Sequence, residues 1–123
     1  MGGGLFVTGG EVTVTGGKIT GNSAVIGGGV RINAGTVEFK DVQFAENTAT
    51  GDNANGGDIS IKGGTVTITG GTFTGNQSRT GGAISSAAEL TVTDATFANN
   101  TSRVNGGALY IEKGKAALTN VTL

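Results

Sequence analysis

The chain has 123 residues, of which 25 are glycine and 14% are charged, and it contains no cysteine, histidine, proline or tryptophan. Without cysteine or histidine it has no disulfide, no zinc-thiolate site and no imidazole base, so we expect no cofactor. A net charge of -1, 5% aromatic residues and short apolar runs argue against nucleic acid as a partner and against a membrane span.

Glycine clusters divide the chain into similar units. The units begin at Gly2, Gly27, Gly56, Gly81 and Gly106, at spacings of 25, 29, 25 and 25 residues. They cover residues 2–26, 27–55, 56–80, 81–105 and, truncated, 106–123. The longer second unit has its extra residues between Thr50 and Asn55, where a loop can lengthen without disturbing its neighbours. A constant period predicts one repeat domain over 1–123.

Within each unit, apolar residues alternate with polar ones, which is typical of strands. The third unit shows three such stretches, Asp58 to Lys62, Thr65 to Thr69 and Thr72 to Gly75, separated by glycine pairs. Threonine, valine and isoleucine favour strands, and no stretch has a sustained helical period. The pattern predicts an all-β fold, a right-handed parallel β-helix (β-solenoid) of about five turns with three short strands per turn, stacked ~4.8 Å apart.

Equivalent apolar positions of the five units are expected to stack inward as columns. The first strand contributes Leu5, Val30, Ile59, Ile84, Leu109 and Val7, Ile32, Ile61, Ser86, Ile111. The second contributes Val12, Val37, Val66, Leu90, Ala116 and Val14, Phe39, Ile68, Val92, Leu118. The third contributes Gly17, Val42, Gly71, Ala95, Val121 and Ile19, Phe44, Phe73, Phe97, Leu123.

A polar column accompanies these apolar ones. Its members, each three residues after the last apolar position of a unit, are Asn22, Asn47, Asn76 and Asn100. Stacked amides can donate to one neighbour and accept from the other, so we interpret the column as structural rather than as a carbohydrate or metal site. The Gly-Gly pairs lack a following Lys-Ser/Thr and a helix, so they indicate corners rather than a phosphate loop.

Two motifs alternate along the chain. Gly-Gly-Ala-Ile spans Gly81 to Ile84, and Phe-x-x-Asn recurs at Phe44 to Asn47, Phe73 to Asn76 and Phe97 to Asn100. Together they resemble the repeat of the chlamydial polymorphic outer-membrane proteins and, more broadly, right-handed β-helix repeats of bacterial surface and autotransporter passenger proteins. Ile19 replaces the phenylalanine in the first unit. The resemblance implies an extended stalk or adhesive surface module, extracellular or at the cell surface.

The two ends of the repeat look uncapped. Leu123 falls in mid-strand of the third face, and no amphipathic capping helix is evident. Solenoids need polar caps, and an unpaired strand edge is a template for another chain. We therefore expect end-to-end self-association, as a dimer or a head-to-tail filament. The phase of the repeat, which starts directly after Met1, favours an excised or engineered fragment, with a filament subunit as the alternative.

Two groups of acidic residues are candidate sites. The segment with Asp52, Asn53, Asn55 and Asp58 gathers oxygen ligands suited to calcium but lacks the spacing of known calcium loops, so a turn is the favoured interpretation. Asp41 and Asp94 occupy equivalent corners two rungs apart and are interpreted, together with the other acids, as solvated corner residues.

The outward side of the middle strand is rich in threonine. A possible ice-binding face would comprise Thr13, Thr15, Thr65, Thr67, Thr69, Thr91 and Thr93. Glu38, Lys40 and Glu89 interrupt the array, and exposed strands use threonine for its β propensity in any case.

The favoured function is therefore a non-catalytic structural module of bacterial surface or adhesin type. Its expected partners are further copies of itself and a host or glycan surface. An ice-binding protein is the first alternative, and a glycan-active β-helix enzyme is the second. Outward Phe6, Arg31 and Tyr110 on the first strand are interpreted as scattered exposed residues.

Overall fold

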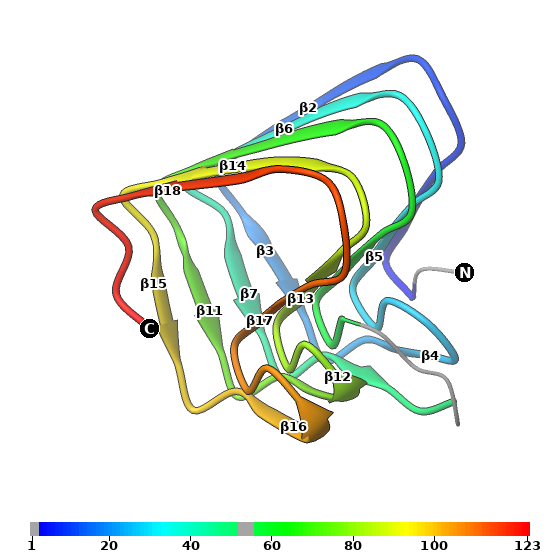
Figure 1. Cartoon of the computed structure of the whole chain (residues 1–123), viewed down its shortest axis with the longest axis vertical. Coiled ribbons are helices and arrows are strands. Elements are labelled where there is room, and N and C mark those ends of the chain that lie inside the picture. The colour runs from blue at the N-terminus through cyan, green and yellow to red at the C-terminus, as the bar shows by residue number, and fades with distance from the viewer. Residues whose placement is uncertain (1–2, 52–55) are drawn as a thin grey trace.

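A computed structural model describes residues 3–51 and 56–123, and within these ranges the chain is all β, without any helix. Figure 1 shows the chain winding into stacked coils, so that strands of successive units lie side by side. Every pairing between the described strands is parallel, because each coil bonds to the coils before and after it. The predicted β-solenoid is confirmed.

The first two strands of each coil build two five-stranded sheets in the described chain. Sheet A contains β1 (Leu5–Val7), β5 (Val30–Ile32), β9 (Ile59–Ile61), β13 (Ile84–Ser86) and β17 (Leu109–Ile111). Sheet B contains β2 (Glu11–Thr15), β6 (Thr36–Lys40), β10 (Thr65–Thr69), β14 (Glu89–Thr93) and β18 (Ala116–Thr119). The predicted register is confirmed, since Val30 pairs with Leu5 and Ile59, and Val66 pairs with Val37 and Leu90.

The last two strands of each coil build two further sheets, four-stranded over the described residues. Sheet C contains β3 (Lys18–Thr20), β7 (Gln43–Ala45), β11 (Thr72–Thr74) and β15 (Thr96–Ala98). Sheet D contains β4 (Ser23–Ala24), β8 (Thr48–Ala49), β12 (Gln77–Thr80) and β16 (Thr101–Asn105).

The number of strands per turn and the number of turns differ from the prediction. Each complete coil has four strands, not three, because the segment after each ladder asparagine is also extended and pairs with its equivalents. The sequence did not predict the strands of sheet D, because they are short, largely polar and irregular, with a register shift between Ser78 and Thr80. About four turns are complete, and the fifth consists of β17, β18 and a single bridge between Thr96 and Thr122.

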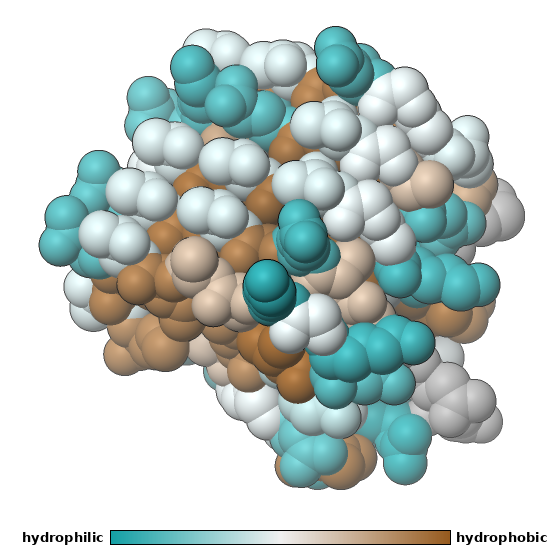
Figure 2. Space-filling view, turned by 45° about the horizontal axis from the view of Figure 1, so that its top comes forward, coloured by the Kyte–Doolittle hydropathy of each residue, from teal (hydrophilic) through white to brown (hydrophobic). Residues whose placement is uncertain are grey.

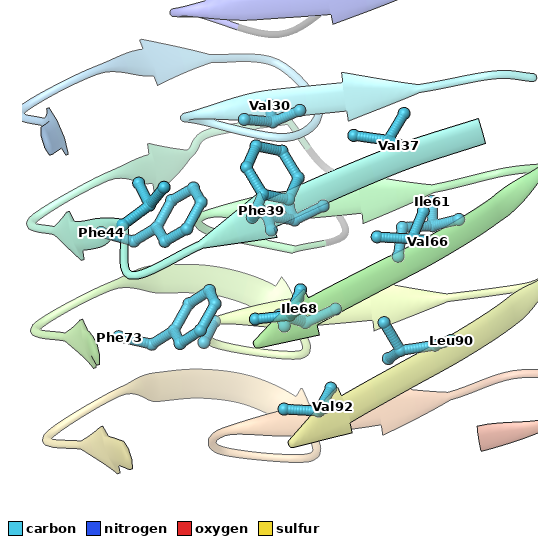
Figure 3. Packing of buried hydrophobic residues seen from close by; sticks show 14 of the residues in the cluster. Val30, Val37, Phe39, Phe44, Ile61, Val66, Ile68, Phe73, Leu90 and Val92 are labelled. Atoms are coloured by element: carbon cyan, nitrogen blue, oxygen red, sulfur yellow. The ribbon is translucent and has the colours of Figure 1, made fainter. Parts of the chain in front are cut away.

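The core is a set of side-chain columns along the solenoid axis. Phe44, Phe73 and Phe97 stack nearly face to face, with ring centroids 4.6 and 4.5 Å apart, and Phe39 meets Phe44 edge-on at 5.3 Å. Figure 3 shows Val66 and Ile68 pointing from sheet B toward the same interior. These side chains are almost fully buried. Because the ~4.8 Å rung spacing is close to the ring separation, identical residues in register pack without a gap.

The fifth coil leaves its inward side chains uncovered on one side. Leu118 is 42% exposed and Leu123 67% exposed, although both continue columns that are buried in the central coils. Leu118 and Leu123 are thus exposed because no further coil of the described structure covers them.

Candidate functional site

The four inward asparagines form one hydrogen-bonded ladder. The Oδ1 atom of Asn47 accepts from the backbone N–H and the Nδ2 of Asn22, at 2.9 and 3.2 Å. Asn76 Oδ1 accepts the backbone N–H of Asn47 at 3.0 Å, and Asn100 Oδ1 accepts the N–H and Nδ2 of Asn76 at 3.1 and 2.8 Å. The amide oxygens of Asn47, Asn76 and Asn100 therefore satisfy a backbone N–H of the preceding coil, which is a structural use of the amide group.

Asp58 lies inside the solenoid against this ladder, with 0% of its surface exposed. It occupies the position directly before the first strand of its coil, where the other units have glycine or alanine. Its Oδ1 accepts a 2.5 Å hydrogen bond from Asn47 Nδ2, while its Oδ2 has no hydrogen-bond partner among the described residues. The direct Asn47 Nδ2–Asn76 Oδ1 distance is 3.5 Å, longer than the equivalent contacts on either side, so the carboxyl group competes with the ladder.

Burial raises the pKa of the Asp58 carboxyl well above its ordinary value, although hydrogen bonds from Asn47 and Asn76 partly oppose the shift. The interpretation of Asp58 as a solvated corner acid is wrong. Its side chain faces inward because its position continues an inward column, a signal already contained in the small residues of the equivalent positions.

Of the four candidate calcium residues, the structure describes only Asp58. Asp52, Asn53 and Asn55 lie outside the described residues, and Asp58 is directed to the interior. Within 3–51 and 56–123, no three acidic side chains group as they would around a metal ion. Asp58 alone offers too few ligands for a hard cation, which takes six to eight oxygens.

Asp41 and Asp94 are corner residues with left-handed backbone, at φ 53° and 58°. Their equivalents in the other coils are Gly16, Gly70 and Asn120, all with positive φ. Glycine, asparagine and aspartate tolerate this conformation best, which explains the choice of residue without invoking catalysis. Asp94 Oδ1 also accepts a 3.0 Å bond from Asn120 Nδ2.

The threonines of sheet B stand in register on its outer face. Thr65 and Thr69 pair with Thr36 and Thr93, and Thr67 pairs with Thr91. Figure 2 shows near-neutral side chains in parallel rows on this side of the molecule, with charged side chains among them. Glu38 and Lys40 of β6 pair with Thr67 and Thr69 and form an exposed ion pair at 3.8 Å, so the array is interrupted at its second coil.

The outer face of sheet A carries a second column that the sequence interpretation treated as scattered residues. In register it consists of Phe6, Arg31, Ser60, Ser85 and Tyr110. Ser60 and Ser85 face outward yet are only 3% and 4% exposed. The corner glycines explain this burial: Gly27 lies so close that a Cβ there would be 3.3 Å from Ser60 Cβ.

A hollow of about 180 Å³ opens over this column. It is lined by Arg31, Ser60, Ile61, Lys62, Ser85, Ala87 and Glu112. Arg31 donates from Nε to Asn33 Oδ1 at 2.9 Å and from Nη1 to Ser60 Oγ at 2.8 Å, which holds the guanidinium on the floor of the trough. We call this feature the sheet A trough.

A family profile places the chain's motifs among known repeats. The profile of the Chlamydia polymorphic membrane protein repeat matches residues 70–87 and 94–112. These two segments are similar to that repeat. No curated protein and no solved structure matches the chain.

Both matches to the polymorphic membrane protein repeat cover the same part of a coil. One spans β11, β12 and β13, and the other spans β15, β16 and β17, so each follows the chain through sheets C, D and A. Each contains one stacked phenylalanine, one ladder asparagine and one glycine corner. The matched segments thus include residues that shape the interior, such as Phe73, Asn76 and Phe97.

Proposed function

We propose that the chain is a non-catalytic structural module of a bacterial surface protein, which self-associates through its end coils. The observation that carries this proposal is the interior, filled along its length by stacked side chains and left open at the fifth coil. The repeat family, named for a membrane protein, supports a parent protein at the cell surface. Among the described residues, no helix is long and apolar enough to cross a membrane.

The uncovered face of the fifth coil favours association with a second copy of the chain. Leu118 and Leu123 present apolar surface beside the unpaired edge of β18, and covering both would remove apolar area and pair backbone groups at once. A second copy offers matching strand spacing and matching inward columns. We expect association at the ends rather than through the polar outer faces.

Light scattering after size exclusion, over a concentration series, tests the association. The average mass of the native chain should rise with concentration, and Leu118→Lys should shift it to the monomer by placing charge on the open coil. Ala117→Lys is the matched control, because Ala117 is the neighbouring position on β18 and points outward, so it should associate like the native chain. A native chain that stays monomeric throughout contradicts the self-association.

A second candidate function, ice binding, rests on the registered threonines of sheet B. Hydroxyl and methyl groups in parallel rows offer a regular surface, although Glu38 and Lys40 disturb it. A thermal-hysteresis measurement on the monomer tests it: clear ice shaping that is lost in Thr67→Lys would favour this function over the structural one. An activity on acidic polysaccharide that vanished in Asp94→Asn would instead favour the enzyme alternative.

A further inference from the structure

We infer that the sheet A trough binds an acidic sugar, with the sugar carboxylate held by Arg31. This inference goes beyond the structural role proposed above. The trough lies on the outer face of sheet A, whereas the proposed association uses inward side chains such as Leu118 at the end of the stack, so the two proposals can fail separately.

Arg31 is a positioned cation without a described counter-ion. Its bonds to Asn33 and Ser60 use two of its five N–H donors and fix its plane, leaving three donors for a ligand. No carboxylate of the described residues pairs with it, and burial lowers the pKa of its guanidinium. A guanidinium held in this way matches the two oxygens of a carboxylate, which it can bind through parallel hydrogen bonds.

A second cation lies diagonally across from Arg31. Lys62 follows β9 and is in register with Asn33, as its backbone bond to Ile32 O at 2.8 Å shows. Arg31, Asn33, Ser60 and Lys62 thus form a square of two cations, one amide and one hydroxyl on adjacent coils. Glu112 lines the hollow from the fifth coil, three rungs from Arg31, so it directs a bound carboxylate toward the Arg31 end.

The remaining surfaces of the trough suit a sugar ring. Ser60 and Ser85 form the almost fully buried floor of the trough. Phe6, 43% exposed and in register with Arg31, provides an aromatic edge one coil before Arg31, beyond the residues that line the hollow. The Lys62 ammonium can donate hydrogen bonds to sugar hydroxyls, and an aromatic ring packs against the C–H face of a sugar. The hollow, about 180 Å³, accommodates one small group rather than a protein surface.

Titration by two-dimensional NMR of the native chain tests this inference with three probes. Glucuronic acid carries both ring and carboxylate, glucose carries the ring alone, and acetate carries the carboxylate alone. We expect glucuronic acid to shift the amide signals around Arg31, Ser60 and Ser85, and to bind at least about tenfold more tightly than either fragment, since each fragment makes only part of the contacts.

Arg31→Gln should weaken glucuronic acid binding by about tenfold or more, because it removes the charge that the carboxylate meets. Arg79→Gln is the matched control, an exposed arginine on β12 in sheet D, and should bind like the native chain. Lys62→Gln, at an exposed position, should weaken binding less than Arg31→Gln and serves as the decisive variant should Arg31→Gln fail to fold.

Three results would overturn the inference. The first is an absence of shifts in the trough with glucuronic acid, and the second is equal weakening by Arg31→Gln and Arg79→Gln. The third is acetate binding as tightly as glucuronic acid, which would assign the trough to a bare carboxylate, such as an acidic side chain of a protein partner. None of these results bears on self-association at the open coil, which light scattering reports independently.

Discussion

The central coils and the fifth coil place similar residues in the same columns with different outcomes. Phe73 stacks between Phe44 and Phe97 and is fully buried, whereas Leu123, one residue beyond the bridge to the Phe97 coil, is mostly exposed. Ile68 is buried and Leu118, two coils further on, is 42% exposed. The burial of an inward side chain therefore depends on the neighbouring coils and not on its own coil alone, as in other repeat proteins.

The largest expected effect is a difference in stability loss between a core residue of a central coil and a core residue of the fifth coil. Phe73→Ala removes a ring stacked on both faces and should lower the free energy of unfolding by about 3–5 kcal/mol. Leu118→Ala, in the fifth coil, should cost well below that, because its cavity already opens to solvent. Chemical denaturation of both variants measures the difference, and equal losses would contradict a stack-dependent core.

A second comparison uses two equivalent corner glycines. Gly71 and Gly17 share a left-handed backbone, at φ +87° and +85°. A Cβ on Gly71 would collide with the backbone of Val42 in the preceding coil, whereas a Cβ on Gly17 would meet nothing within 4 Å. Gly17→Ala should cost about 1–2 kcal/mol from backbone strain alone. Gly71→Ala should lower the stability further, because its Cβ also meets the preceding coil, and thermal denaturation of both variants measures the difference. A smaller loss of stability in Gly71→Ala than in Gly17→Ala would contradict close contact between the coils at this corner.

The asparagine ladder offers a third test. Asn76→Ala leaves the backbone N–H of Asn47 without its acceptor inside the stack and should cost about 1–3 kcal/mol. Asn22→Ala should cost less, since the Asn22 Oδ1 receives no hydrogen bond from the described residues and its surroundings are partly exposed. Hydrogen exchange of the Asn47 amide reports the local effect, and an unchanged exchange rate in Asn76→Ala would argue against the ladder.

The last prediction concerns pH and the buried Asp58. Because its pKa is raised in the folded chain, the folded state binds its proton more tightly than the unfolded state does. The free energy of unfolding should be highest below the ordinary carboxyl range and fall as pH rises from about 4 toward the folded pKa, by at most about 1.4 kcal/mol per pH unit. Asp58→Asn should remove this slope in a series of denaturation curves, and an unchanged slope would assign it to other groups.

Much of this architecture could be predicted because the repeat carries the same information five times. Alternating residues such as Val66 and Ile68 set the inward face of a strand, and the recurrence of Phe44, Phe73 and Phe97 set the register between coils. Sheet D could not be predicted in the same way. Strands such as Thr48–Ala49 are too short to show an alternation, and their pairing depends on the coils above and below them.

The candidate sites were harder to predict from the sequence than the fold. Asp58 belonged to a candidate calcium loop in the sequence, but its side chain lies against Asn47 in the interior. Ser60 and Ser85 carried no signal at all, because their burial comes from corner glycines that fold over the outside of sheet A. Arg31 and Lys62 are 31 positions apart in the sequence. They lie at diagonal corners of one trough because adjacent coils stack on each other.

The amino-acid sequence by itself determined the repeat, the parallel stacking, the inward columns and the inward amides, because each follows from a period that local chemistry repeats along the chain. The tertiary structure decided the fourth sheet, the contact of the buried Asp58 with the asparagine ladder and the trough on sheet A. These depend on which residues adjacent coils bring together and on how closely the corners approach, and neither quantity is encoded at any single position.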